Sequence, residues 1–162
     1  MLAKPKSDYD ITLTIRSEVE QISLLCEALH ALCLYASGSA ECAFAVQQAA
    51  AEAINNVVEH AYHNQPDNEI VVGWYQEERQ IHIDILDTGL SMVRLPKPIL
   101  PDFEAESSRG WWIINASVDK YFYQTICDTF AGPVLHPGGI GTDFKVLENI
   151  PHTNILTLLK RF

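Results

Sequence analysis

Basic residues are scarce in this chain of 162 residues. Its 11 Lys and Arg stand against 21 Asp and Glu, which gives a formal net charge of -10 and a pI near 4.9. A surface of this charge repels the phosphates of nucleic acids and the headgroups of anionic lipids. We therefore expect no nucleic acid and no membrane among its partners.

Long hydrophobic runs are also missing. No stretch approaches the roughly 20 consecutive apolar residues that a helix needs to cross a bilayer. The first residues lack the apolar core of a secretory signal. Together these absences predict a cytoplasmic protein.

The cysteines lack the spacing of a metal or redox motif, because no two of them form a Cys-x-x-Cys pair. Three lie in segments with helical periodicity, where cysteine behaves as a small hydrophobic residue. Reduced thiols in the core are one interpretation, and a redox or metal role is the other. The four residues are Cys26, Cys33, Cys42 and Cys127.

Hydrophobic residues make up 48% of the chain, which is enough for one domain with a substantial core. Strand-like alternation and helix-like periodicity occur in separate stretches of the sequence. The predicted elements are a strand at 10–15, a helix from Ser17 to Gly38 with Ser17 and Glu20 as a capping box, a helix from Ser39 to His63, a hairpin of strands 69–75 and 80–86, a loop at 91–108, a short helix around 111–116, a strand at 118–127, a turn at 132–141 and a strand at 142–147.

This order groups the helices apart from most of the strands, which predicts an α+β fold. We expect a two-layer sandwich, with a mainly antiparallel sheet and the helices on one face. Residues 1–9 are predicted to form an arm, residues 10–148 the domain, and residues 149–162 a tail that adds a strand or short helix at a sheet edge. The loop at 91–108 holds three prolines and is long enough to suggest a functional segment.

A polar stripe runs along the second predicted helix. Glu52, Asn56 and Glu59 fall within about 60° of one another at ~100° per residue, and Val57 and Ala61 lie on the other side. A solvated helix face would explain this stripe. A site is the alternative, because Asn is a poor helix former whose amide oxygen suits Mg²⁺. A Glu one turn earlier can accept a proton from a hydroxyl.

The strand at 80–86 is followed by Asp87, Thr88 and Gly89. An Asp-x-Gly sequence is a frequent turn. It is also suited to ligand binding, because a carboxylate accepts a hydrogen bond from an exocyclic amine and glycine lets a ligand approach the backbone.

Two further motifs contain small residues. Ser107, Ser108, Arg109 and Gly110 open a predicted helix, whose N–H groups could hold phosphate oxygens or bind nothing. Glycines at 138–141 precede Thr142; they could form a simple turn, or Thr142 could offer its hydroxyl to a site.

The order and spacing of these motifs over residues 10–148 resemble the GHKL ATPase superfamily, which has the Bergerat ATP-binding fold. The stretch AAAEAINNVVEHAY and the short chain between the second and third motifs are similar to the anti-sigma-factor serine/threonine kinase branch. The resemblance implies ATP and Mg²⁺ as cofactors.

The resemblance also implies roles for individual residues. Asn56 would coordinate Mg²⁺, Glu52 would be the catalytic base, and Asp87 would contact the adenine amino group. Four residues would complete the pocket: Gly89, Arg109, Gly110 and Thr142. His60 and Asn55 are assigned supporting roles, and the loop at 91–108 would be an ATP lid.

Two positions depart from the family pattern, because Ser91 and Ser108 stand where the family has glycine. Glycine there permits a positive φ and a close approach to phosphate. A protein with a degenerate nucleotide pocket that only binds partners is therefore the alternative to a kinase. The ATP-binding part of a histidine kinase is disfavoured, because the chain leaves no room for a dimerisation domain.

The partners implied by the resemblance are proteins. A protein of this branch holds a sigma factor inactive and phosphorylates a small STAS-type anti-sigma-factor antagonist on Ser or Thr. The resemblance also implies a homodimer.

Overall fold

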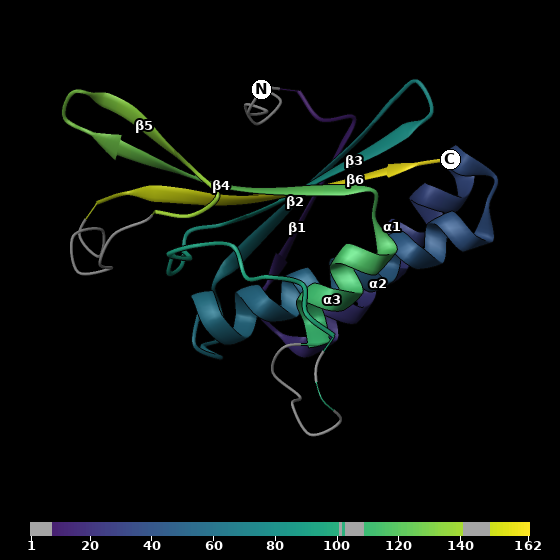
Figure 1. Ribbon diagram of the computed structural model, residues 1–162, viewed down its shortest axis with the longest axis horizontal. Coiled ribbons are helices and arrows are strands. Elements are labelled where there is room, and N and C mark those ends of the chain that lie inside the picture. Colours follow the sequence, from purple (N-terminus) through teal and green to yellow (C-terminus); the bar gives the residue numbers. More distant parts are fainter. Residues whose placement is uncertain (1–7, 101, 103–108, 141–149) are drawn as a thin grey trace.

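The computed structural model describes residues 8–100, 102, 109–140 and 150–162. Helices and strands form two layers, with the helices below the sheet in Figure 1. The predicted two-layer α+β fold with a mainly antiparallel sheet is confirmed. The elements are β1 (Ile11–Arg16), α1 (Val19–Ser37), α2 (Ala40–Asn56), the π-helical turn η1 (Val57–Ala61), β2 (Glu69–Glu77), β3 (Gln80–Asp87), α3 (Arg109–Ser117), β4 (Lys120–Thr129), β5 (Gly132–Pro137) and β6 (His152–Arg161).

The described strands form one six-stranded sheet in the order β1-β2-β3-β6-β4-β5, and all neighbours are antiparallel. Strand β6 lies in the interior, between β3 and β4. The expectation that the tail closes a sheet edge is therefore wrong for residues 152–161. Residues 154–158 are all buried, because β6 has a neighbouring strand on each side and is covered on both of its faces.

The last part of the chain differs from the prediction in one more place. Residues 132–137, predicted as a turn, form β5 and pair with β4 in a hairpin. The strand predicted at 142–147 lies outside the described residues. The hairpin predicted at 69–86 is confirmed, with Glu78 in a tight turn at φ 52°.

The first two helices are joined by a sharp turn that the sequence marks clearly. Gly38 ends α1 in the left-handed conformation and donates its N–H to the Leu34 carbonyl at 2.9 Å. Ser39 caps α2, because its Oγ accepts a hydrogen bond from the Cys42 N–H at 3.1 Å.

The start of α1 does not carry the predicted capping box. Glu18 occupies the N-cap position and makes no side-chain capping bond. The Ser17 hydroxyl instead donates to the Gln65 carbonyl at 2.7 Å and accepts from the Asn68 N–H at 3.2 Å. Ser17 thus fastens the end of β1 to the segment before β2.

The second helix changes its geometry directly after Asn56. Its α-helical part ends there, and residues 57–61 form a π-helical turn in which the Tyr62 N–H bonds the Val57 carbonyl at 2.9 Å. Single π-turns inside helices are frequent at functional sites. The continuous α-helix predicted to His63 is therefore wrong beyond Asn56.

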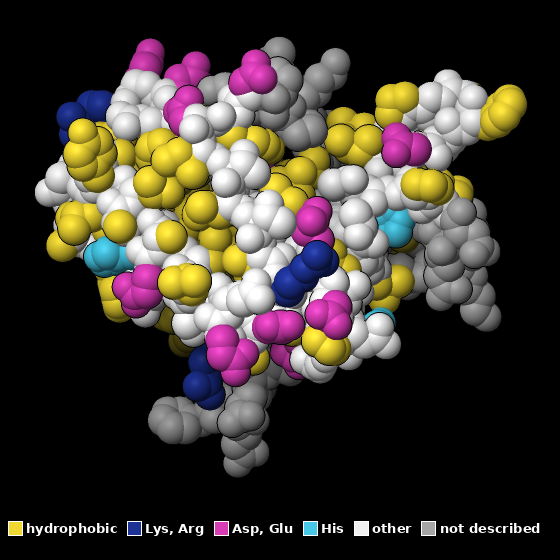
Figure 2. Space-filling view, turned by 180° about the vertical axis from the view of Figure 1, so that it is seen from behind, with side chains coloured by type: hydrophobic (Ala, Val, Ile, Leu, Met, Phe, Trp, Pro, Cys, Tyr) yellow, Lys and Arg dark blue, Asp and Glu magenta, His cyan; other side chains and the backbone are white. Residues whose placement is uncertain are grey.

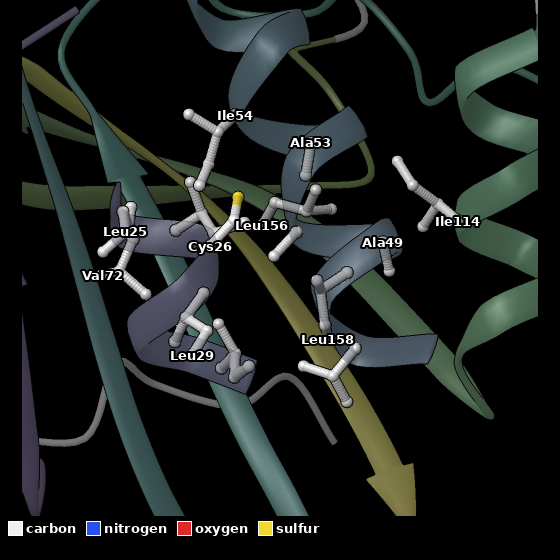
Figure 3. Packing of buried hydrophobic residues seen from close by; sticks show 14 of the residues in the cluster. Leu25, Cys26, Leu29, Ala49, Ala53, Ile54, Val72, Ile114, Leu156 and Leu158 are labelled. Carbon is white, nitrogen blue, oxygen red and sulfur yellow. The ribbon is translucent and has the colours of Figure 1, made fainter. Parts of the chain in front are cut away.

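The core lies between the helices and the sheet. Figure 3 shows Leu25 and Leu29 of α1, Ile54 of α2 and Ile114 of α3 beside Val72, Leu156 and Leu158 of the strands. All four cysteines are free and buried. Burial raises the pKa of Cys26 to about 11 and that of Cys33 to about 12, which favours the interpretation as unreactive core thiols.

Helix α1 is the one described helix that is long and apolar enough to cross a membrane. It supplies five buried residues to the core, including Leu29 and Cys33. Its apolar composition therefore agrees with a core helix of an α+β domain. From behind, acidic side chains lie both along the upper edge and over the lower part of the surface, and few basic ones lie between them (Figure 2).

The interior position of β6 predicts a large effect of a core truncation there. Leu158 is 2% exposed, so Leu158→Ala should lower the free energy of unfolding by about 2 to 5 kcal/mol. Urea denaturation monitored by circular dichroism measures this change. Leu135→Ala on β5 removes a side chain that is 38% exposed and should cost clearly less. Equal losses in both variants would contradict an interior β6.

Candidate functional site

A pocket of about 440 Å³ lies between the second helix, the sheet and the segment that follows β3. Its walls are mostly apolar and include a few polar groups, as is usual for small-molecule sites. The lining residues come from α2 and η1 (Ala53, Asn56, Val57, His60, Ala61), from the sheet (Asp87, Tyr123, Leu156), from the segment after β3 (Leu90, Met92, Val93, Arg94, Pro96, Lys97) and from α3 (Trp111).

The helix wall brings together three residues that the sequence predicted for the site. Glu52 and Asn56 are one turn apart on α2, and Gly110 of α3 lies against both. A Cβ on Gly110 would lie 3.0 Å from Glu52 Oε2 and 3.6 Å from Asn56 Nδ2. Glycine at 110 thus lets α3 approach the two polar side chains.

Asn56 has an unsatisfied polar atom. Its Nδ2 is buried and has no hydrogen-bond partner among the described residues. A buried donor without a partner costs free energy, and it is the kind of group that a bound ligand satisfies. Asn56 lines the pocket. Glu52 lies one turn earlier on α2, beside Gly110.

Three other residues of the second helix lie on a different side of the helix than predicted. Val57 and Ala61 line the pocket together with Asn56, although they were expected on the opposite side. Glu59 is exposed and lies outside the pocket lining, with its carboxylate 4.0 Å from His60 Nε2. The prediction assumed a regular α-helix, and the π-turn after Asn56 changes the direction of the side chains that follow.

Asp87 lines the pocket and is 6% exposed. Burial raises the pKa of this carboxyl group to about 6, against the opposing effects of hydrogen bonds from Asn154 and from the Gly89 N–H and of the charge of His152. Both hydrogen bonds end on Oδ1, at 2.8 Å and 2.9 Å. No hydrogen bond joins Oδ2 to the described residues, so Oδ2 is the oxygen that we expect a ligand to meet.

Gly89 is needed for packing against the helix. A Cβ there would lie 2.5 Å from the Ala61 carbonyl oxygen, which accepts the Leu90 N–H at 3.0 Å. Its φ is not in the left-handed region. The atoms that Gly89 admits belong to η1, and the approach of a ligand to its backbone stays a prediction.

Ser91 makes a buried hydrogen bond instead of straining the backbone. It is 3% exposed, its φ is not positive, and its Oγ donates to Asn154 Oδ1 at 2.6 Å. The concern that glycine is required here for a positive φ does not apply to this chain.

The segment after Ser91 is held by the glycines at 138 and 139. The Leu95 N–H donates to the Gly138 carbonyl at 2.9 Å, and the Ile140 N–H donates to the Met92 carbonyl at 3.0 Å. Gly139 has φ 125° and lies against the backbone of Val93, where a side chain would collide. These glycines thus fix one wall of the pocket.

The basic residues at the pocket are ones that the motifs did not identify. Arg94 and Lys97 line it, and they are the only Lys or Arg in the sequence of 91–108. Two basic residues in a proline-containing stretch without other basic residues are the sequence signal that could have identified them. Arg109, which was predicted for the site, is exposed at the start of α3. Thr142 and Ser108 lie outside the described residues.

Comparison with known families agrees with this geometry. The family model described as a histidine kinase-like ATPase domain matches residues 15–129, which is more than half of the chain. The chain belongs to this family. No curated protein matches the chain.

Membership in the histidine kinase-like ATPase family confirms the predicted superfamily and implies an ATP-binding domain. The match contains the helix with Glu52 and Asn56, Asp87, and α3. It ends before β5 and β6, so the Asn154 side of the pocket lies outside the matched residues.

The environment of Asp87 predicts a pH-dependent stability for this ATPase domain. Its pKa is about 6 in the folded protein and near 3.8 without burial, so the folded state binds the proton more tightly. Stability from this group is therefore lost as pH rises from about 4 to about 6, by roughly 3 kcal/mol at most.

Asp87→Asn removes this titration while its Oδ1 can keep both hydrogen bonds. The stability of the variant relative to the native protein should rise between pH 4 and pH 6 and stay constant above pH 7. Urea denaturation across this range measures the difference, with Asp128→Asn, on the exposed part of β4, as control. A difference that does not vary with pH would disprove the assigned environment.

Proposed function

We propose that this protein is an ATP- and Mg²⁺-dependent protein serine/threonine kinase of the anti-sigma-factor type. The observation that carries the proposal is the pair of Glu52 and Asn56 beside Gly110, next to a pocket that Asn56 and the buried Asp87 both line. The carboxylate and the amide come from α2, and the acceptor comes from the end of β3.

The pocket suits an adenine ring. Its lining includes Met92, Trp111, Tyr123 and Leu156, which offer apolar and aromatic surface for a flat heterocycle. Asp87 Oδ2 is an acceptor, so it fits the exocyclic amino group of adenine. The carbonyl that guanine carries at the corresponding ring position would leave the carboxylate without a donor.

The polar residues of the pocket lining suit phosphates. Arg94 and Lys97 supply positive charge from one wall, and Asn56 supplies an unsatisfied amide from the other. The described residues contain no group of three His, Cys, Asp or Glu that could hold a metal. Asn56 would bind Mg²⁺ through its amide oxygen, together with phosphate oxygens and water, and the ion would neutralise charge on the transferred group.

Glu52 is placed to act on the acceptor. It would accept the proton of a Ser or Thr hydroxyl while that oxygen forms a bond to the γ-phosphorus of ATP. The bond between the γ-phosphorus and the β,γ-bridging oxygen breaks, and ADP leaves with its electron pair. Glu52 Oε2 lies 3.0 Å from the position that a Cβ on Gly110 would take, and Glu52 is one turn from Asn56, which lines the pocket.

The proposed protein partners are a sigma factor and a STAS-type antagonist. Phosphorylation adds about 1.5 to 2 negative charges to the antagonist. This kinase has a net charge of -10, so repulsion would release the modified antagonist. The unmodified antagonist would compete with the sigma factor for the same protein, which would act as a homodimer.

Binding of ATP tests the nucleotide site. Isothermal titration should detect ATP with Mg²⁺ and weaker binding without it, and Asn56→Ala should remove the difference between the two conditions. Asn55→Ala is the matched control, because Asn55 is the adjacent residue but is exposed on the outer side of α2. No binding at millimolar ATP would favour the alternative of a regulator that only binds partners.

Transfer of phosphate tests the role of Glu52. With radiolabelled ATP and a STAS-domain antagonist as acceptor, Glu52→Gln should keep ATP affinity within about twofold and reduce transfer by about 100-fold or more. Glu59→Gln, which changes an exposed Glu on the same helix, should transfer normally. Normal transfer by Glu52→Gln would show that Glu52 is not the base.

A further inference from the structure

Asn154 hydrogen-bonds to Asp87 and to residues around it, and none of the sequence motifs identified it. It is 1% exposed on β6, and in the sheet register it lies opposite Asp87 of β3 on one side and Thr125 of β4 on the other. Its strand lies outside the residues that match the family model.

The amide of Asn154 has four hydrogen bonds. Nδ2 donates to Asp87 Oδ1 at 2.8 Å and to the Gly89 carbonyl at 2.9 Å. Oδ1 accepts from Ser91 Oγ at 2.6 Å and from Thr125 Oγ1 at 2.9 Å. Both donors and both acceptor positions of the amide are therefore used.

This network determines which way the amide points. The Asp87 carboxylate and the Gly89 carbonyl can only accept, so the NH₂ group of Asn154 must face them, and the hydroxyls of Ser91 and Thr125 donate to its oxygen on the other side. The NH₂ group engages Oδ1 of the carboxylate and leaves Oδ2 for the pocket. Because Ser91 is one of the two donors, the serine at a family glycine position contributes directly to this arrangement.

We propose that Asn154, oriented by Ser91 and Thr125, is the positioning residue that directs Asp87 Oδ2 towards the amino group of the bound base. The proposal rests on the proposed ATP-binding function. It assigns to β6 a part in base recognition. Asn154 acts through Asp87 and does not itself line the pocket.

The substitution that separates this role from simple packing is Asn154→Asp. It keeps the shape of the side chain and an acceptor for Ser91 and Thr125, but it replaces the NH₂ donor by a carboxyl group beside Asp87. Two carboxyl groups at this distance share one proton at moderate pH. The shared proton takes the place of the amide N–H, and its loss at higher pH leaves two charges facing each other.

The expected result is an inverted pH profile of ATP binding. The native protein should bind more weakly below about pH 6, where Asp87 becomes protonated, and evenly from pH 6.5 to 9. Asn154→Asp should bind comparably at pH 6.5 and about tenfold or more weakly at pH 9. Fluorescence titration with ATP measures both, and circular dichroism at each pH verifies folding.

Other charged or titratable groups also face this region and are common to both proteins. His152 contacts the Gly89 carbonyl through Nε2 at 2.6 Å, and its charge acts on Asp87. Tyr62 and Tyr123 are in electrostatic contact with Asp87 from the helix end and from β4. Among the described residues, His60, Arg94 and Lys97 also line the pocket. A difference between the native and variant profiles therefore reports on residue 154.

Thr157→Val provides the control on the same strand. Thr157 is buried on the other face of β6, where its Oγ1 donates to Asp84 Oδ1 at 2.6 Å. Thr157→Val therefore also removes a buried hydrogen bond, but the pH profile of its ATP binding should be the same as that of the native protein. An Asn154→Asp profile that matches the native one, in folded protein, would overturn the proposal.

A second measurement separates this inference from the proposed function. The ¹³C carboxyl signal of Asp87, followed by NMR in protein without nucleotide, should titrate at higher pH in Asn154→Asp than in the native protein. Failure of the native protein to bind ATP would overturn the proposed function and base recognition with it. An unchanged Asp87 titration would overturn the control of Asp87 by Asn154, whether or not ATP binds.

Discussion

The pairing of β6 with β3 and β4 is the constraint on which the pocket depends. Strands β2 and β3 form a hairpin on one side, with β1 paired to β2 across the chain of the first two helices, and β4 and β5 form a hairpin on the other side. Strand β6 is the only described element that hydrogen-bonds to both groups. It thereby sets the separation of Asp87 on β3 from Tyr123 on β4, two residues that line the pocket from different strands.

The helix layer meets the sheet through close backbone contacts. Gly89 admits the Ala61 carbonyl, and Gly110 admits the side chains of Glu52 and Asn56. Tyr62 adds a third contact, because its hydroxyl donates to the Glu69 carbonyl at 2.6 Å and accepts from the Thr88 N–H at 3.0 Å. These contacts hold the π-turn against the end of β3, beside Asp87.

Local patterns in the sequence were sufficient to predict much of this structure. The alternation in residues 69–86 predicts the hairpin, and Gly38 followed by Ser39 marks the break between α1 and α2. The order of Glu52, Asn56 and Asp87 predicts residues that the fold brings to one region. Each of these signals depends on neighbours in the chain, whose geometry is fixed by backbone periodicity.

The features that the sequence did not reveal depend on distant contacts. Asn154 meets Asp87 across 67 positions of the chain, and no local pattern encodes that pairing. Residues 154–158 are buried on both faces, so they lack the alternation that identifies a half-exposed strand. The Ser17 and Glu20 spacing fits a capping box, but the hydroxyl finds a better partner in the segment before β2. Gly89 has an ordinary φ, and its packing role is visible only where η1 lies over it.

The interior location of a strand so late in the sequence has a consequence for the order of folding. The two hairpins contain contacts between nearby residues and can form early, whereas β6 must close loops that are far longer. Until it docks, β3 and β4 each present an unpaired edge, which is the feature that promotes aggregation between chains. Completion of the nucleotide pocket and protection of these edges therefore occur in the same late step.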